Sequence, residues 1–380
     1  MGHVVNVSTY FLQVPQTEWA SEKVARCAFR LASWLTEPIC LAREFLYRAR
    51  VMDASWRMVF LWLGVFACVP VGLVTALPAI ALRKLGAFLQ KDPFIRFNGE
   101  AVPKVLASNS FSLLSWNICA VGGGYSITDG GVVPIGERME AILRKIMDKD
   151  ADVNCLYEVF DVETAYSIAD VLKERGYTDF CFNIGHQPIG TSSGIFIASK
   201  YKMGGLEFSR FPLEALVGRT KNCAKGIFAF DVMSQNKVFA RIHATHLQHS
   251  EEPSFPTEEE ICARKSQMDI MIEKVNAARD KCAVVTGDLN LDDEEYAVSS
   301  WKDLFVKGEA CVGSTFGGDR FCASLMGKRV SGPLNLDHTM ILKGSASSIA
   351  TSLVATGYNA DFYRASALSD HEGVYSEIVL

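Results

Sequence analysis

Residues 281–290 read KCAVVTGDLN, an apolar run with polar side chains where it ends. A short apolar run between polar residues is typical of a strand buried in a sheet. Alternation along such a strand puts Asp288 and Asn290 on one face. A carboxylate there can orient a nucleophile or a metal ion, and an amide can donate to a phosphoryl oxygen. The simpler alternative is an Asx turn that closes the strand.

Short polar motifs stand at or near the ends of other apolar runs as well. The full set, in chain order, is Ser115-Trp116-Asn117, Leu156-Tyr157-Glu158, Thr245-His246-Leu247-Gln248, Gly287-Asp288-Leu289-Asn290, Leu336-Asp337-His338 and Ser369-Asp370-His371. Each motif alone has little specificity. Together they bring Asn, Glu, His and Asp to strand ends, and these side chains are what a magnesium-dependent phosphodiesterase needs.

Predicted strands and helices alternate from residue 111 onward. Alternation of this kind predicts an α/β fold. The expected strands cover 111–120, 151–160, 178–184, 194–199, 226–232, 237–247, 281–290, 337–342 and 373–380. The expected helices cover 137–148, 161–175 (with Asp161 as N-cap) and 257–279.

The motifs resemble those of the endonuclease/exonuclease/phosphatase superfamily, and within it those of membrane-bound neutral sphingomyelinases. Glu158-Val159-Phe160 resembles the Gln-Glu-Val-Phe signature, with Tyr157 in place of Gln, and Thr-His-Leu-Gln at 245–248 matches directly. The resemblance implies a two-sheet β-sandwich flanked by helices, as in pancreatic-type deoxyribonuclease. The implied reaction is Mg-dependent hydrolysis of sphingomyelin to ceramide and phosphocholine.

The metal site implied by the resemblance consists of Glu158, Asn117 and Asp370. Mg²⁺ takes hard oxygen donors and needs few carboxylates, so Mg²⁺ is the expected cofactor and Mn²⁺ a possible substitute. Read by itself, Glu158 would be a solvent-facing residue at a strand end. Asn117 would then simply begin a turn.

The remaining site residues also follow from the resemblance. The catalytic residues are His246, His371, Asp337, Asp288 and Asn290, and the residues expected on the substrate phosphate are Asn290 and Lys225. Histidine titrates near neutrality, so His371 can act as a base whose tautomer Asp337 fixes. His246 then stabilises the transition state or protonates the leaving alkoxide. The acid and base labels can be exchanged between the two histidines.

The three-residue spacing of His243, His246 and His249 also suggests a zinc site. Zinc sites of the HExxH type need a helix, whereas this stretch is predicted as a strand running into a loop. On a strand, His243 and His246 face opposite sides. His243 and His249 are therefore expected to be structural or solvated.

The sequence departs from the family pattern at three further positions. His338 stands where Tyr is usual, and Ser192 where Asn is usual. Thr220, five residues before Lys225, stands where membrane-bound relatives carry an Asp. An Asp–Lys switch therefore lacks its Asp here, whereas Lys225 remains available as a cation beside the phosphate.

The N-terminal part of the chain is expected to associate with a membrane. Residues 1–90 form this region, residues 91–110 a linker and residues 111–380 the catalytic domain. Residues 18–50 predict an amphipathic helix in the membrane interface, with a helix packed on its own domain as the alternative.

Residues 58–82 carry no charge and are long enough to cross a bilayer. Pro70 and Pro78 argue against one straight helix, and basic residues on both flanks disfavour sending either flank across. We therefore predict a re-entrant or interfacial hairpin that keeps the catalytic domain on one face and contacts the membrane through residues 18–86. A single bent span is the close alternative, and a buried core helix is the weaker one.

Charge and cysteine content bound the partners and the compartment. Residues 1–100 carry a net charge of +4 and the rest −9. A basic, apolar N-terminus suits anionic lipid, whereas an acidic catalytic part is a poor match for nucleic acid. The 11 cysteines are scattered and give no disulfide framework. This favours a membrane-associated protein whose catalytic domain faces a reducing, cytoplasmic compartment.

Three other functions stay open at this point. Specificity lies in loops, so the substrate could instead be another phospholipid head group such as a phosphoinositide, cleaved by a phosphatase or phospholipase-C-type reaction. A Mg-dependent nuclease would share the same core site. A membrane-anchored relative without activity is the third alternative.

Overall fold

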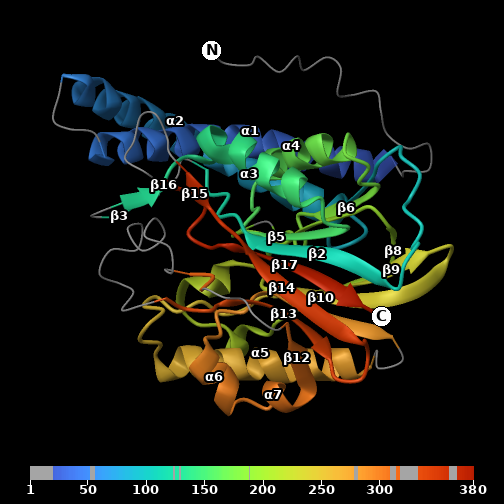
Figure 1. Ribbon diagram of the computed structural model, residues 1–380. Helices are drawn as coiled ribbons and strands as arrows, with labels where there is room; N and C mark the ends of the chain where they lie inside the picture. Colours follow the sequence, from blue (N-terminus) through green and yellow to red (C-terminus); the bar gives the residue numbers. More distant parts are fainter. Residues whose placement is uncertain are drawn as a thin grey trace.

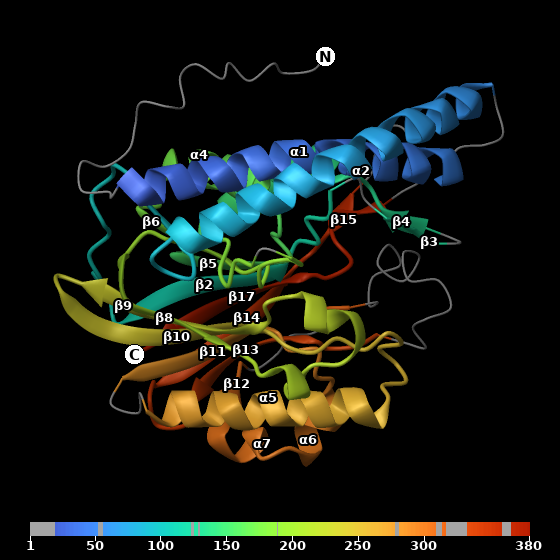
Figure 2. The ribbon, with the colours of Figure 1, turned by 180° about the vertical axis from the view of Figure 1, so that it is seen from behind.

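The computed structural model describes residues 20–51, 56–122, 125–127, 130–187, 189–277, 281–308, 314–316, 333–358 and 366–380. Two β-sheets pack face to face, and helices cover both outer faces (Figure 1). Helices α1 to α4 lie on one side of the sandwich, and α5 to α7 lie on the other (Figures 1 and 2). The predicted α/β fold, a two-sheet sandwich flanked by helices, is confirmed.

The first sheet has seven strands in the order β1-β6-β7-β5-β2-β17-β14. Its strands are β1 (Ile95–Asn98), β2 (Ser110–Asn117), β5 (Val153–Tyr157), β6 (Asp179–Phe182), β7 (Phe196–Ser199), β14 (Ser348–Val354) and β17 (Gly373–Val379). β2 and β5 are parallel neighbours. Their carboxyl ends, at Asn117 and Tyr157, therefore meet at one edge of the sheet.

The second sheet has six strands in the order β12-β13-β11-β10-β9-β8. Its strands are β8 (Lys202–Arg210), β9 (Gly226–Ser234), β10 (Lys237–His246), β11 (Cys282–Asp288), β12 (Phe305–Lys307) and β13 (Asp337–Leu342). β10 and β11 are parallel, and His246 pairs with Asp288 at their ends. Gly287 allows this close approach, because a Cβ there would lie 1.8 Å from Thr245 O.

Apolar side chains from both sheets fill the space between them. This central core includes Leu113, Val153, Phe228, Ile242 and Val284. The outer face of each sheet has its own apolar cluster beneath the helices that cover it. Apolar packing therefore stabilises both faces of each sheet, and polar side chains can gather at the strand ends.

Five helices complete the part of the fold that follows the first sheet strand. They are α3 (Ile135–Lys149), α4 (Val162–Lys173), α5 (Glu258–Asn276), α6 (Asp293–Val298) and α7 (Trp301–Leu304). The predicted N-cap at Asp161 is present, since its side chain accepts from Thr164 N at 2.8 Å. α5 begins with a capping box between Thr257 and Glu260.

Short elements connect these layers. They are the strand pairs β3 (Tyr125–Ile127) with β4 (Gly130–Val132) and β15 (Gly357–Tyr358) with β16 (Ser366–Ala367), and the 3₁₀ turns η1 (Leu213–Ala215) and η2 (Gly218–Asn222).

The two N-terminal helices, α1 (Ala20–Val51) and α2 (Arg57–Leu89), pack side by side in opposite directions (Figure 2). Small residues of α2 face α1 at seven-residue intervals, at Gly72, Ala79 and Gly86. A Cβ on Gly72 would lie 2.5 Å from the Ile39 side chain, and a Cβ on Gly86 would lie 3.0 Å from the Phe29 ring. The glycines therefore set how closely the helices approach.

The uncharged run 58–82 differs from the sequence expectation in one respect. It forms one continuous helix through Pro70 and Pro78, so the hairpin arises from α1 with α2 and not from a turn within the run. Both prolines lie on the exposed side of α2, away from the small residues that hold it against α1. Among the described residues, α2 is the one helix long and apolar enough to cross a membrane.

The predicted helix over residues 18–50 is present as α1, with its charged side turned toward the catalytic domain. Arg30 pairs with Glu163 of α4 at 2.5 Å, and Arg48 pairs with Glu137 of α3. Apolar side chains of α1 point away from the domain and are exposed, namely Val24 (49%), Leu31 (44%) and Trp34 (45%). The helix is thus packed on its own domain through one face and leaves an apolar face uncovered.

The segment 91–110, expected to be a linker, contains strand β1. β1 pairs with β6 at the edge of the first sheet, with Ile95 opposite Phe182. Beyond it, Lys104 reaches Asp152 at 2.5 Å. The short apolar stretch here gave little periodicity, so the sequence did not reveal that it belongs to the sheet. Residues 1–19 and 52–55 of the predicted membrane region lie outside the described residues.

Candidate functional site

The predicted site residues gather at one edge of the sandwich, where strands of both sheets end. Asn117 ends β2, Glu158 follows β5, His246 ends β10 and Asp288 ends β11. Antiparallel strands β13 and β17 add residues at their starts. Asp337 begins β13, and Asp370 and His371 lie just before β17. Parallel pairing aligns the strand ends within each sheet, and packing of the two sheets brings residues such as Asn117 and Asp288, 171 positions apart, into one cluster.

Asn117 joins the carboxylates from the two sheets. Its Nδ2 donates to Glu158 Oε1 at 3.2 Å and to Asp288 Oδ2 at 2.9 Å. The other atom of its amide, Oδ1, accepts from Cys119 N at 3.0 Å and so fixes the orientation of the side chain. Asn117 is 1% exposed. It therefore sets the separation between Glu158 and Asp288.

Glu158 has the properties of a cation ligand. Burial and the nearby Asp370 carboxylate together raise its pKa to about 7. Its backbone has φ +62°, a conformation that non-glycine residues rarely adopt. Such a carboxylate, beside Asp370 and Asp288, is stabilised by positive charge. The oxygen-rich donor set suits Mg²⁺, so Glu158 and Asp370, with Asn117 positioning them, fit the predicted metal site.

A second donor group lies next to the first. Ligand atoms of Asp288, Asp337 and His371, all buried, come within 4.8 Å of one another and make a candidate metal group. Imidazole is a poor ligand for Mg²⁺, and His371 Nδ1 is already bonded to Asp337 Oδ2 at 2.7 Å. The geometry of the Asp337–His371 pair is therefore compatible with the predicted proton transfer, and Asp288 belongs to both groups.

The two site histidines converge on one carboxylate. Asp288 Oδ2 lies 3.4 Å from His246 Nε2 and 3.6 Å from His371 Nε2. Both rings are 5% exposed. Oδ2 is also the oxygen that accepts from Asn117, so a single atom connects the metal ligands to both histidines.

The electrostatic surroundings give these histidines opposite properties. Burial lowers the pKa of His246 well below the usual value, and the Lys225 ammonium lowers it further. Burial also acts to lower the pKa of His371, but Asp337 and Asp288 outweigh it and hold that pKa well above the usual value. His371 is thus the stronger base of the two.

Asn290 and Lys225 complete the predicted set. Asn290 adopts φ +49°, its backbone N–H donates to Asp288 Oδ1 at 3.1 Å, and its Nδ2 has no hydrogen-bond partner among the described residues. Lys225 is 4% exposed and donates to Leu247 O at 2.7 Å, and burial lowers its pKa to about 8. Both side chains carry unused donors at the site. The structure therefore brings all nine predicted residues together, and their chemical roles stay predictions.

The other histidines lie away from this point. His243 faces the opposite side of β10 and bonds Val284 O through Nδ1. His249 contacts Thr220 Oγ1 at 3.2 Å, and Gln248 donates to the same hydroxyl. His338 donates to Leu291 O at 2.7 Å from a buried position. His243 and His246 point to opposite sides of β10, as the alternation along a strand predicted.

Two supporting residues escaped sequence analysis. Phe316 packs its ring against His371 with centroids 4.8 Å apart. Thr315 Oγ1 accepts from the backbone N–H groups of Leu336 and Asp337, and its backbone O accepts from Glu372 N. Both lie in a stretch without periodic pattern, so no signal in the sequence pointed to them.

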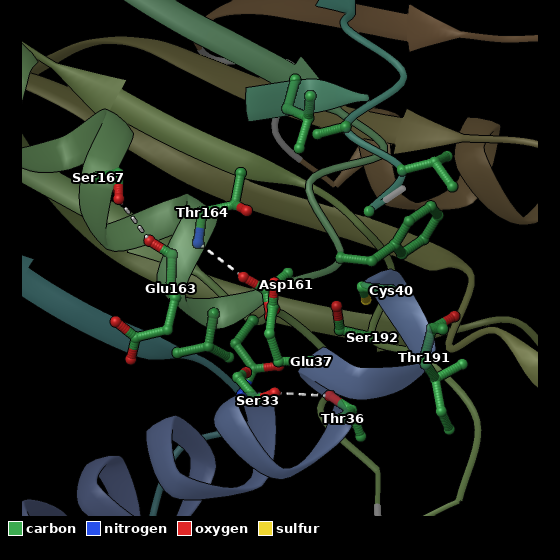
Figure 3. A pocket seen from close by; sticks show the side chains of 18 of the residues that line it. Ser33, Thr36, Glu37, Cys40, Asp161, Glu163, Thr164, Ser167, Thr191 and Ser192 are labelled. Atoms are coloured by element: carbon green, nitrogen blue, oxygen red, sulfur yellow. Dashed lines mark hydrogen bonds between the residues drawn. The ribbon is translucent and has the colours of Figure 1, made fainter. Parts of the chain in front are cut away.

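A cavity of about 660 Å³ separates α1 from the catalytic domain. Figure 3 shows Ser33, Glu37 and Cys40 of α1 facing Asp161 and Ser192 of the domain. None of the nine site residues lines this cavity. It borders the chain segments that follow Asn117 and Glu158, and it is distinct from the predicted site.

Solved structures share this fold. No protein-family model matches the sequence, and no curated protein sequence matches it. Sphingomyelinase C from Streptomyces griseocarneus superposes with a TM-score of 0.57 at 17% identity, over 70% of this chain and 99% of that chain. A variant of beta toxin from Staphylococcus aureus with bound magnesium ions gives 0.57 at 18% identity, over 70% and 99%.

A third structure carries the superfamily name itself. The endonuclease/exonuclease/phosphatase from Beutenbergia cavernae DSM 12333 gives a TM-score of 0.51 at 19% identity, over 71% of this chain and 72% of that chain. Identities this low establish the shared fold. The deoxyribonuclease-like sandwich that the resemblance implied is thereby confirmed.

Proposed function

We propose that this protein is a Mg²⁺-dependent phosphodiesterase that hydrolyses sphingomyelin to ceramide and phosphocholine at a membrane surface. The observation that carries the proposal is the meeting of three groups at Asp288 Oδ2, which lies within 2.9 to 3.6 Å of Asn117, His246 and His371. A metal-binding carboxylate group and two histidines around one point are what phosphodiester hydrolysis requires.

Glu158, Asp370 and the oxygen of Asn117 or Asp288 are the groups that would hold Mg²⁺. When bound, the ion supplies charge neutralisation and polarisation of a phosphoryl oxygen. The raised pKa of Glu158, caused by burial and by Asp370, means that added positive charge would stabilise the ionised Glu158 carboxylate. That property favours a metal site over a solvent-facing glutamate.

The base in this reaction is His371. Asp337 accepts the Nδ1–H at 2.7 Å, which leaves Nε2 free to take a proton from water and stabilises the imidazolium that forms. The water oxygen then attacks phosphorus, and the bond from phosphorus to the ceramide oxygen breaks. His246 donates a hydrogen bond or a proton to the departing oxygen. The sequence allowed either histidine to be the base, and this mechanism takes His371 as the base and places His246 at the leaving oxygen.

Two neutral or cationic donors bind the phosphate oxygens. Asn290 offers an Nδ2 without a protein partner, and Lys225 offers an ammonium whose position is fixed by Leu247 O. Preorganised donors of this kind stabilise the charge that develops on phosphoryl oxygens in the transition state. Both therefore affect turnover more than substrate affinity.

The substrate assignment rests on sequence and on the exposed N-terminal hairpin. The Thr-His-Leu-Gln motif and the net charge of −9 beyond residue 100 favour a phospholipid over nucleic acid. The fold is shared with a sphingomyelinase C, among others. Apolar side chains on the uncovered faces of α1 and α2 favour attachment to a membrane.

The hairpin favours attachment to one leaflet. α2 packs along α1, and α1 is joined to the catalytic domain by Arg30–Glu163 and Arg48–Glu137. A spanning α2 would have to leave the contacts that Gly72 and Gly86 make with α1. We therefore place the hairpin along the surface of an anionic or zwitterionic membrane, with the catalytic domain in the cytoplasmic compartment.

The test is a substrate panel. Full-length protein in detergent and Mg²⁺ is assayed on mixed micelles of sphingomyelin, phosphatidylcholine or a phosphoinositide, and on duplex DNA. We expect phosphocholine release from sphingomyelin to exceed every other activity. Faster nicking of DNA would identify the protein as a nuclease instead. A preference for phosphoinositide would identify it as a hydrolase of that head group.

A further inference from the structure

Arg138, in the first turn of α3, is completely buried and donates to four backbone carbonyls. Nε donates to Val133 O at 2.9 Å, and Nη1 donates to Ile118 O at 2.6 Å and to Leu368 O at 2.5 Å. Nη2 donates to Cys119 O. A buried guanidinium is tolerated because these carbonyl dipoles surround it.

The carbonyls that Arg138 holds belong to the two segments that carry the site. Ile118 and Cys119 directly follow Asn117 at the end of β2. Leu368 directly precedes Ser369-Asp370-His371, some 250 positions later in the chain. A single fork of hydrogen bonds therefore joins the Asn117 side of the site to the His371 side.

Two further bonds run between the same segments. Ser369 Oγ donates to Asn117 O at 2.6 Å, and Trp116 Nε1 donates to His371 O at 2.9 Å. These bonds and the Arg138 fork fix the distance between the residues that hold metal and the residue that moves a proton. Proton transfer and metal binding both depend on such distances to within a fraction of an ångström.

The segment after Asn117 has a strained backbone and lies beside a cavity. Cys119 has φ +46°, which is unfavourable for a non-glycine residue. The next residues, Ala120 to Gly122, line the cavity between α1 and the domain. The bonds from Arg138 to Ile118 O and Cys119 O hold the backbone where this segment begins.

We propose that Arg138 is a positioning residue that sets the separation of the metal ligands from the Asp337–His371 pair. The proposal rests on the proposed phosphodiesterase function for its kinetic consequence, but not for its metal-binding consequence. An arginine that only filled the core would change stability and leave metal affinity and turnover per folded molecule unchanged.

The test compares Arg138→Met with Arg144→Met. Methionine keeps the approximate length of the side chain and removes all donors. Arg144 lies six residues further along α3, is largely exposed, and pairs with Glu140 at 2.8 Å. Circular dichroism reports folding, electron paramagnetic resonance reports Mn²⁺ binding without substrate, and micellar sphingomyelin gives kcat and KM.

For folded Arg138→Met we expect the Mn²⁺ dissociation constant to rise at least ~10-fold and kcat to fall ~10²-fold, because small displacements of reacting groups reduce rates by this much. KM should stay within about twofold of wild type. Arg144→Met should match wild type in all three. Wild-type Mn²⁺ affinity and kcat in folded Arg138→Met overturn the proposal. If Arg138→Met does not fold, Arg138→Lys takes its place, because it keeps the charge but loses the forked set of donors. Its Mn²⁺ dissociation constant should also rise and its kcat should also fall.

The remaining outcomes are also decisive. Wild-type kcat and Mn²⁺ affinity in Arg138→Lys show that the fork is not needed and overturn the proposal. Failure of both variants to fold assigns Arg138 to the core and overturns it as well. If wild-type protein binds Mn²⁺ but does not cleave sphingomyelin, the proposed substrate is wrong, and the Mn²⁺ comparison still tests Arg138.

Discussion

His371 and Asp337 form a 2.7 Å hydrogen bond between Nδ1 and Oδ2 at the buried edge of the sandwich. The two residues come from different sheets, since His371 precedes β17 and Asp337 begins β13. Asp337 holds the pKa of His371 well above its usual value against the opposing effect of burial. The pair therefore fixes both the tautomer and the basicity of the proposed base.

Asp337→Asn tests this relationship. Loss of the carboxylate lowers the pKa of His371, so the acid limb of the pH–rate profile should move to lower pH. It also removes stabilisation of the imidazolium, so kcat should fall by ~10²-fold or more. The exposed Asp303→Asn is the matched control. An unchanged acid limb in Asp337→Asn would show that His371 is not the titrating base.

His246→Ala and His371→Ala should each lower kcat by at least ~10²-fold, a typical contribution of general acid–base catalysis. His249→Ala, which removes a partly exposed ring in contact with Thr220, should leave kcat near wild type. His243→Ala should lower stability while kcat per folded molecule stays, because its ring faces away from Asp288. A loss of kcat in His243→Ala equal to that in His246→Ala would contradict the site assignment.

Metal affinity should depend on pH through Glu158. Burial and Asp370 raise the pKa of Glu158 to about 7 in the metal-free protein, so protons compete with the ion near neutrality. Mn²⁺ binding, measured without substrate, should strengthen as pH rises from 6 to 8. Glu158→Gln should bind weakly at both pH values. Equal affinity at pH 6 and pH 8 in wild-type protein would remove Glu158 from the ligand set.

Acid stability should depend on two buried histidines outside the site. Burial lowers the pKa of His243 and of His338 to about 4, whereas both titrate near 6.5 when unfolded. As the pH falls, these histidines are protonated in the unfolded chain before they are protonated in the folded protein. The free energy of unfolding therefore keeps its full value above pH ~6.5 and decreases between pH ~6.5 and ~4. The loss should be roughly 3 kcal/mol for each histidine, at about 1.4 kcal/mol per pKa unit.

His338→Tyr isolates one of these contributions. Denaturant unfolding of this variant at pH 7 and pH 5 should show a smaller loss of stability than wild type, because tyrosine does not titrate there. A loss equal to that of wild type would mean that His338 is protonated in the folded protein at pH 5.

Membrane attachment should depend on the uncovered face of α2. Leu73 and Leu77 are 67% and 74% exposed, so replacing both with Asn should not disturb the fold. Binding to phospholipid vesicles should fall at least ~10-fold, because a buried leucine contributes about 2 kcal/mol, while micellar activity stays. Val298→Asn, 83% exposed on α6 across the sandwich, is the control. Equal binding by both variants would contradict attachment through α2.

Tags test the arrangement on one leaflet. Tags at residues 1 and 380 should be equally accessible to a protease on sealed vesicles, because a surface hairpin leaves both ends on one side. Protection of one tag alone would show that α2 spans the bilayer.

The strand-end motifs predicted which residues lie close together, because a strand and its end can be recognised from a short stretch of sequence. Parallel β10 and β11 end together, so Thr245-His246 and Gly287-Asp288 had to meet once both stretches were strands. The same logic located Asn117 and Glu158. Strands β8 and β14 were missed, since their mixed burial gives no clear apolar pattern.

The sequence did not reveal which face of α1 is buried, nor the long-range contacts of two single residues. The buried face of α1 consists mainly of small residues such as Ala25 and Ala28, whereas several large apolar side chains of this helix are exposed. Periodicity alone assigns the larger side chains to the core. Arg138 and Phe316 act as single residues whose partners are distant in sequence. No local spacing marks such contacts, and only the folded chain brings them together.

The most direct test of a metal-dependent phosphodiesterase at this edge is phosphocholine release from sphingomyelin micelles by full-length protein, before and after chelation. The account predicts release in Mg²⁺, none in excess EDTA, and recovery when Mg²⁺ or Mn²⁺ is restored, with folded Glu158→Gln inactive throughout. Undiminished release in excess EDTA, or wild-type rates in Glu158→Gln, would contradict it.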